Sequence, residues 1–417
     1  MAPVSHYARP AQLMPALLIF AFCMMMIATS RGMGETYGIF LLPLTDHFGW
    51  NRASVTSVYS VYMVSYGLGS LLSGLVFDRL GPRANYSLGL AMLAGCYGFA
   101  GQLQSLVAFY VVVGVCGGVG AAMVGIVPTQ SLLSRWFKRK RTTALSIAYA
   151  GQGIGVMLLA PAAQMAISAV GWQSAYQLAS DGFIACFILI LFMPWRRIAI
   201  GANDVAATTR PSISQAAPGL SLGEAVYRLE FWGFFTIFGA SAISVFGVSL
   251  QAVAYLVEQG FSKVEAAFAF GFVGMLTILG IALPGILAER FPRHIVATGS
   301  YGLTIAGITA LAALQFYQSW ALLVIFVVCF GLSAGARGPI ITAQMAELFA
   351  GRGLASIFGA TNIGQGCGAA LGAFLAGFLY DMTSGYNTGF IVSLIFAVVG
   401  MAVFWLVPAI RHGRAVS

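Results

Sequence analysis

Long apolar runs separated by short polar breaks make up most of this chain. A helix needs about 20 apolar residues to cross the hydrocarbon core of a bilayer. Twelve runs are long enough, and they cover 14–43, 53–77, 84–104, 106–132, 142–168, 173–193, 229–257, 265–287, 294–316, 319–346, 354–379 and 386–408. The pattern therefore predicts an all-α membrane protein with twelve transmembrane helices.

The composition excludes most soluble classes of protein. Of 417 residues, 59% are hydrophobic and 8% are charged, whereas an ordinary soluble domain carries about 25% charged residues. So few charges cannot cover a water-facing surface, which excludes a soluble enzyme, a nucleic-acid-binding domain and a disordered regulator. The six cysteines lie inside apolar runs without CxxC spacing, and no histidine lies inside a run. We therefore predict no metal site and no cofactor.

The basic residues predict the orientation. With the N-terminus inside, 17 of the 21 Lys and Arg residues fall in cytoplasmic segments, and the outside loops hold only Arg52 and Lys263. Since short cytoplasmic loops carry an excess of Lys and Arg, both termini are predicted to be cytoplasmic. The expected location is the cell inner membrane.

The chain repeats itself around a long polar loop at 194–228. The matching positions are Asp78 and Glu289, Pro128 and Pro339, and Gln152 and Gln365, at offsets of 211, 211 and 213 residues. Because equal offsets in one order indicate an internal repeat, two homologous six-helix bundles are predicted, at 1–193 and 229–417, joined by a cytoplasmic linker.

A glycine-rich loop follows the second run and predicts a conformational latch. It runs from Gly74 to Arg83, and a shorter copy follows the eighth run. The predicted latch residues are Gly74, Asp78, Arg79, Gly81, Arg83, Glu289 and Arg290. The glycine would let two helices approach closely, and an aspartate is favoured at a helix N-terminus of the other half. The alternative is a solvated turn that carries positive-inside charge.

This loop resembles the signature between helices two and three of the major facilitator superfamily. Two further stretches, Gly38–Arg52 and Arg135–Arg141, resemble the bacterial branch of monocarboxylate porters and oxalate/formate antiporters. The resemblance covers the whole chain and implies two six-helix bundles with the first, fourth, seventh and tenth helices around a central cavity. That branch often carries a substrate-binding arginine in helix eight, and the eighth run here has no basic residue in its interior.

Two arginines lie deep inside apolar runs. Arg31 is in the first run and Arg337 is in the tenth. A basic side chain at mid-membrane costs at least about 2.5–3.5 kcal/mol, so it normally faces a cavity or a partner. Because a guanidinium matches a carboxylate bidentately, both arginines are predicted to bind a small organic anion. The alternative is a helix-packing ion pair, for which Glu35 is one turn from Arg31.

Neutral polar residues are predicted to complete the binding site. They are Gln152, Gln365, Asn362, Tyr149, Gln251, Tyr255 and Tyr62. Glu35 and Asp181 are the candidates for proton coupling, since each is a carboxyl at membrane depth. A structural role is the alternative for Asp181.

The predicted function is secondary active transport of a monocarboxylate by alternating access, with proton symport or anion exchange. The sequence contains no Walker motif and no Ser-His-Asp or metal set, so neither ATP-driven transport nor an enzyme is expected. The expected partners are the anion, a proton or counter-anion, and lipid, with no nucleic acid, and the protein is expected to be a monomer. The alternative on the same fold is an exporter of apolar drugs or metabolites.

Overall fold

The computed structural model describes residues 10–136, 141–195, 220, 222–349 and 354–412, and these residues are almost entirely helical. The helices are α1 (Pro10–Glu35), α2 (Tyr37–Phe48), α3 (Arg52–Ala100), α4 (Leu106–Phe109), η1 (Tyr110–Gly117), α5 (Gly118–Val124), α6 (Ile126–Trp136), α7 (Arg141–Leu191), α9 (Leu222–Ala225), α10 (Leu229–Glu258), α11 (Lys263–Arg290), α12 (Arg293–Ala313), α13 (Trp320–Ala334), α14 (Arg337–Leu348), α15 (Leu354–Thr383), α16 (Asn387–Leu406) and α17 (Pro408–His412). Most of the predicted 194–228 linker lies outside the described residues.

Two of these helices each contain two membrane crossings. Gly81 in α3 and Gly171 in α7 both have a φ of 83°, a conformation that glycine adopts without steric cost, so the chain turns there. The other crossings are α1 with α2, α4 through α6, α13 with α14, and α10, α11, α12, α15 and α16. The prediction of twelve transmembrane helices is confirmed.

Two crossings break just before a proline. Gly125 separates α5 from α6, three residues before Pro128, and Gly335 follows the end of α13, four residues before Pro339. Proline has no N–H to donate to the preceding turn, and its ring clashes with that turn's carbonyl. Each proline thus favours a break in the helix just before it. Because Pro128 and Pro339 are matching positions of the repeat, the two breaks lie at matching positions as well.

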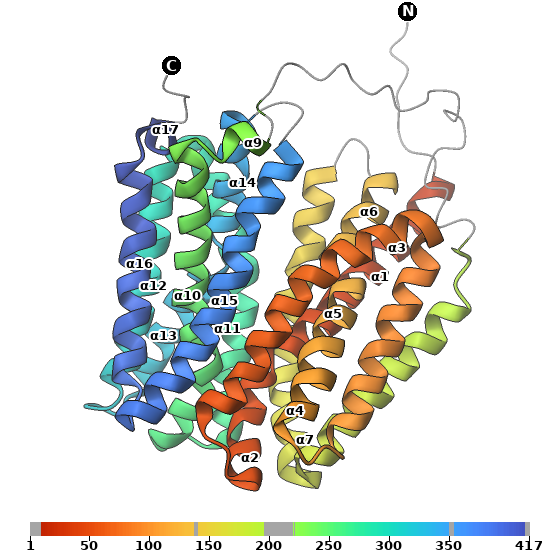
Figure 1. The fold of residues 1–417 in the computed structure, drawn as a ribbon, viewed down its shortest axis with the longest axis vertical. Coiled ribbons are helices and arrows are strands. Elements are labelled where there is room, and N and C mark those ends of the chain that lie inside the picture. The colour runs from red at the N-terminus through yellow and green to blue at the C-terminus, as the bar shows by residue number, and fades with distance from the viewer. Residues whose placement is uncertain (1–9, 137–140, 196–219, 221, 350–353, 413–417) are drawn as a thin grey trace, which may run out of the picture.

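Helix starts at one end of the molecule are fixed by side-chain caps. The side chains of Asn51, Ser105 and Ser319 accept hydrogen bonds from the first turns of α3, α4 and α13. At α11, Ser262 and Glu265 form a reciprocal capping box. These contacts satisfy N–H groups that a helix leaves unpaired at its start. We call this end the α2 end, and the opposite end, which carries α17, the α17 end (Figure 1).

Within each bundle a glycine holds two helices in close contact. A Cβ added to Gly155 of α7 would lie 2.0 Å from the carbonyl oxygen of Ala28 in α1. In the second bundle, a Cβ added to Gly368 of α15 would lie 2.4 Å from the carbonyl oxygen of Gly239 in α10. Small residues drive helix association in membranes because they let backbones approach. The same helix pair is therefore packed in the same way in both repeats.

In the described part of the chain, glycines make close contacts between the two bundles at three helix pairs. Gly153 of α7 packs against Gly274 of α11, Gly377 of α15 against the backbone of Arg52 in α3, and Gly38 of α2 against the backbone of Leu250 in α10. Figure 1 shows the ribbons of the two bundles meeting at the α2 end and diverging toward the α17 end.

Candidate functional site

A cavity of about 270 Å³ lies between the two bundles. Helices α1, α6 and α7 of the first bundle and α10, α11, α13, α14 and α15 of the second contribute residues to its wall. Predicted site residues from both halves line it: Arg31, Glu35, Gln152, Gln365 and Arg337. The cavity thus gathers charged and amide groups from both repeats in one space.

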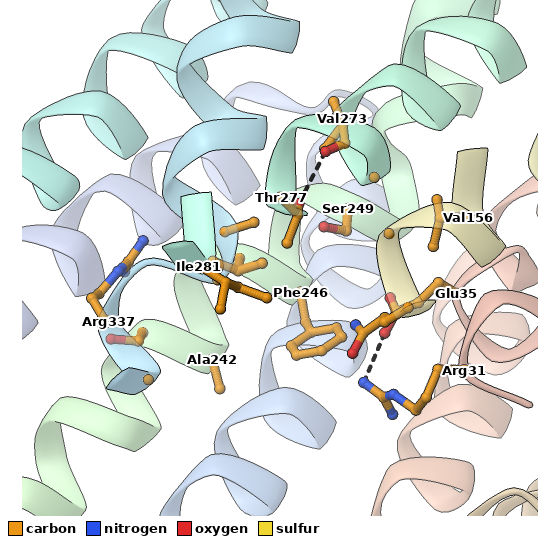
Figure 2. Close-up of a pocket in the computed structure, with 18 of the residues that line it drawn as sticks. Arg31, Glu35, Val156, Ala242, Phe246, Ser249, Val273, Thr277, Ile281 and Arg337 are labelled. Atoms are coloured by element: carbon orange, nitrogen blue, oxygen red, sulfur yellow. Dashed lines mark hydrogen bonds and ion pairs between the residues drawn. The ribbon is translucent and has the colours of Figure 1, made fainter. Parts of the chain in front are cut away.

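Most of the remaining wall is apolar. Four aromatic rings line the cavity, those of Phe238, Phe246, Phe270 and Phe330. In the view of Figure 2, the ring of Phe246 lies between Arg31 and Arg337. Ligand sites usually combine apolar walls with a small number of placed polar groups, and this cavity has that composition.

Arg337 is held by neutral groups. Its Nη2 atom donates hydrogen bonds to Oγ1 of Thr304 at 2.5 Å and to the carbonyl oxygen of Ser333 at 3.2 Å. Its guanidinium carbon lies 4.3 Å from the ring centroid of Tyr301. The residue is only 4% exposed. Within the described part of the chain, no carboxylate pairs with Arg337 and its Nη1 atom has no hydrogen-bond partner.

Arg31 differs because it has an acidic partner. Its Nη2 atom lies 3.0 Å from Oε1 of Glu35, one helical turn further along α1. The other oxygen of Glu35 accepts a hydrogen bond of 3.5 Å from the hydroxyl of Tyr59, and the ring of Tyr66 lies 4.9 Å from the guanidinium. Both side chains of the pair are nearly buried, at 12% and 11% exposed. The intrahelical pair therefore forms and still faces the cavity.

The other predicted polar residues lie elsewhere. Tyr149 and Asn362 are not among the described residues that line the cavity, although Gln152 and Gln365 one turn away are. Tyr62 lines a second, much smaller cavity inside the first bundle. Asp181 is exposed on α7 and is likewise outside the cavity wall.

Gln251 and Tyr255 lie nearer the α2 end of α10. Oε1 of Gln251 accepts a hydrogen bond of 3.4 Å from Arg52. The ring of Tyr255 packs edge-on against Tyr386 at 4.9 Å and against Phe390 at 5.1 Å. Gln251 therefore belongs to the contact between the bundles, whereas Tyr255 packs inside the second bundle, and neither residue is among those that line the central cavity.

The predicted latch is only partly described. The side chains of Asp78 and Glu289 lie outside the described residues, while Arg79, Arg83 and Arg290 are exposed. Gly81 makes the turn between two crossings. A Cβ added to Gly74 would meet no described atom within 4 Å, so the close helix approach expected there is not made in this conformation.

Sequence reasoning missed a cluster around Arg52 at the α2 end. The Arg52 guanidinium forms an ion pair with Glu258 and a hydrogen bond with the hydroxyl of Tyr386. Its guanidinium carbon also lies 3.7 Å from the ring centroid of Tyr380. The backbone N–H groups of Arg52 and the next residue donate to the Asp381 carboxylate at 3.0 and 2.6 Å. An arginine in an outside loop, where basic residues are rare, was the available signal.

One ion pair lies outside the membrane-spanning segments. The Arg293 guanidinium donates to both carboxylate oxygens of Glu347, at 2.5 Å each, near the α17 end. These hydrogen bonds lower the pKa of Glu347 below its ordinary value. The pair links α12 to α14 within the second bundle.

Comparison with known proteins decides the family. A model of the Major Facilitator Superfamily matches residues 17–317 and 277–416, which together cover nearly the whole chain. The chain belongs to this superfamily. The predicted family and its two-bundle fold are confirmed, and this major facilitator protein is a transporter rather than an enzyme.

Named relatives of this transporter are similar along most of its length. Monocarboxylate transporter 13 of Rattus norvegicus is 24% identical over 90% of the chain and 85% of the relative. Monocarboxylate transporter 11 of Mus musculus is 26% identical over 91% and 84%. The uncharacterized MFS-type transporter YcxA of Bacillus subtilis is 25% identical over 91% and 92%.

A solved structure shares the fold of this transporter. A crystal structure of the nucleoside transporter NupG superposes with a TM-score of 0.72, covers 95% of this chain and 99% of that one, and is 16% identical in sequence. At that identity the likeness concerns the fold alone.

Proposed function

We propose that this transporter carries a small organic anion, a monocarboxylate, by alternating access between the two bundles. The observation that carries the proposal is Arg337, a buried guanidinium in the cavity wall without a carboxylate partner among the described residues. A basic group inside a membrane normally has a partner. A carboxylate bound in the cavity would be that partner, and Nη1 is the donor left to bind it.

The second arginine supports a coupled cycle. Arg31 is neutralised by Glu35, and both face the cavity. A proton on Glu35 would remove the negative charge of the pair and leave Arg31 available to the anion. Proton symport uses this step, whereas anion exchange needs only that one anion replaces another at the arginines.

The charges in the cavity wall favour a substrate with one carboxylate over a substrate with two. The cavity offers one guanidinium without an acid and one that shares its charge with Glu35. The rest of the wall is largely aromatic and aliphatic, which suits the apolar part of a monocarboxylate. The names of the relatives, monocarboxylate transporters 13 and 11, agree with this substrate class.

We further propose that the α17 end faces the cytoplasm of a cell whose inner membrane holds the transporter as a monomer. The positive-inside rule supports this orientation. The contacts at the α2 end then close the outer side, and the conformation described here is inward-facing (Figure 1).

The test is to measure the uptake of labelled monocarboxylates into vesicles that contain the Arg337→Gln or the Arg337→Lys variant of the transporter. Losing a charged hydrogen bond costs about 1.5–3 kcal/mol, so we expect an increase in KM of about 10-fold or more for the glutamine variant. Lysine keeps the charge but not the fork, and its KM is expected to lie between. Arg228→Gln removes the same charge from an exposed site at the start of α10 and should leave uptake unchanged. Unchanged uptake in Arg337→Gln would refute the anion site.

The aromatic wall favours one alternative, export of apolar drugs or metabolites. Phe238, Phe246, Phe270 and Phe330 are the largest apolar side chains among the residues that line it. In that case Arg337→Gln protein would still extrude an apolar dye, and carboxylates would not compete. Competition by a carboxylate that disappears in Arg337→Gln favours the anion transporter.

A further inference from the structure

The contact at the α2 end joins a cation of one bundle to acids of the other. Arg52 begins α3 and belongs to the first bundle. The described groups that contact its guanidinium all come from the second bundle: Gln251 and Glu258 of α10, Tyr380 of α15, and Tyr386 at the start of α16. Any movement that separates the bundles at this end therefore takes all of these groups away from Arg52 together.

The partner that matters chemically is the Glu258 carboxylate. It accepts hydrogen bonds from the hydroxyls of Tyr386, at 2.9 Å, and Tyr380, at 3.4 Å, as well as from Arg52. Arg52 is 6% exposed, while the Glu258 side chain is 38% exposed. A carboxylate thus already pairs with a buried guanidinium at the α2 end, and this carboxylate is partly exposed to solvent.

We propose that Arg52 is a second anion site, where the transported carboxylate binds first when the α2 end opens, in the place that Glu258 occupies in this conformation. The inference rests on the proposed function, because it assumes that the substrate is a carboxylate. The proposed site lies outside the central cavity, and Glu258 would compete with the substrate carboxylate for Arg52.

Elementary electrostatics support the exchange. Once the bundles separate, Arg52 keeps its charge but loses its acid, and removing one partner of a paired charge is costly. Glu258 contacts Nη2 of Arg52, while Nη1 contacts Gln251 and Tyr386. A carboxylate arriving from solution can bind both Nη atoms at once and so repays that cost. A cation at the mouth of a cleft also raises the local concentration of anions. Closure then requires the anion to move inward, toward Arg337, so that Glu258 can bind Arg52 again.

Two substitutions break the same ion pair and separate the possible roles. Glu258→Gln and Arg52→Gln both remove the ion pair, but only the first keeps the guanidinium. If Arg52 merely closes the α2 end, both variants should change the KM for uptake from that side equally. If Arg52 binds the anion, Glu258→Gln should leave KM unchanged or lower it, while Arg52→Gln should raise it about 10-fold or more.

Binding can be measured without transport. Benzoate is the probe and benzamide, which has no charge, is the control, and titration calorimetry is performed on two double variants of the full chain. Glu258→Gln with Arg337→Gln should bind benzoate saturably and ignore benzamide. Arg52→Gln with Arg337→Gln should bind neither. Both proteins retain Arg31 and lack the Arg52–Glu258 ion pair, so the difference between them reports whether the Arg52 guanidinium is present.

The outcomes are distinguishable from those that concern the central site. Equal benzoate binding by the two double variants, or its absence from both, would overturn the second site. Normal uptake by Arg337→Gln alone would overturn the proposed central site and would leave the Arg52 measurement standing. Should Arg52→Gln fold poorly, Arg52→Lys replaces it, and we expect weaker benzoate binding than in the protein with arginine because lysine lacks the fork.

Discussion

Replacing Gly153 by alanine would place a methyl group in the contact between the bundles. The added Cβ would lie 2.2 Å from the carbonyl oxygen of Gly274 and 2.7 Å from Cγ1 of Ile278. Real Cβ atoms essentially never approach closer than 3.0 Å. Since the nearest atom belongs to the backbone, α7 and α11 would have to move apart. Overpacking of this kind costs about 1–3 kcal/mol.

The internal repeat supplies a matched control. Gly366 of α15 is the counterpart of Gly153, and a Cβ added to it would meet no described atom within 4 Å. Alanine is better than glycine in a helix by about 1 kcal/mol, and this gain applies to both sites, so it cancels between them. We therefore expect the free energy of unfolding of the Gly153→Ala variant to be about 1–3 kcal/mol lower than that of the Gly366→Ala variant.

The assay is thermal or denaturant unfolding in detergent, followed by tryptophan fluorescence, together with vesicle uptake. Gly366→Ala should be as stable as the parent protein or more stable. Gly153→Ala should be less stable than Gly366→Ala, and its uptake should fall because the bundles no longer pack closely along α7 and α11. Equal stability of the two variants would refute the assignment of Gly153 to a tight inter-bundle contact.

Two further predictions concern carboxylates. In Glu35→Gln, uptake driven by an inward proton gradient should fall about 10-fold or more while anion exchange persists, because Arg31 no longer has a titratable partner; stimulation by the gradient equal to that of the parent would contradict proton coupling. In Glu347→Gln, loss of the half-exposed pair with Arg293 should lower the free energy of unfolding by less than about 1 kcal/mol at pH 7. The pKa of Glu347 is depressed below its ordinary 4.5, so this contribution is present above that pH and lost as the pH falls through the depressed value. Unfolding measured against pH should show the two proteins converging in acid, and a difference that grew there would contradict the pairing.

The membrane topology could be predicted from the sequence because it depends on local properties. A run of about 20 apolar residues is sufficient to identify a crossing, and fixed offsets between similar motifs are sufficient to identify a repeat. The breaks before Pro128 and Pro339 follow in the same way from the geometry of a single residue. Each of these features is determined within a short stretch of chain.

The site could be predicted only in part, because lining depends on helix rotation and on contacts between bundles. Gln152 and Gln365 line the cavity, whereas Tyr149 and Asn362, one turn earlier, do not. Arg31 and Arg337 could be found because a charge in an apolar run is conspicuous. The cluster around Arg52 joins residues about 200 and more than 300 positions apart, which no local pattern reveals. Glu258, at the end of α10, looks like an ordinary surface residue in the sequence.

The Asp381 carboxylate caps a helix that belongs to the other bundle. It accepts the first two backbone N–H groups of α3, at Arg52 and Ala53. When the bundles part, Asn51 still accepts from Ser54, but the first two N–H groups of α3 lose their acceptor. Losing such a capping contact destabilises a helix by about 0.5–2 kcal/mol, so the first turn of α3 is less stable in each excursion. The transporter without substrate should accordingly favour the conformation in which the α2 end is closed. Amide hydrogen exchange at the start of α3 would measure how often this end opens.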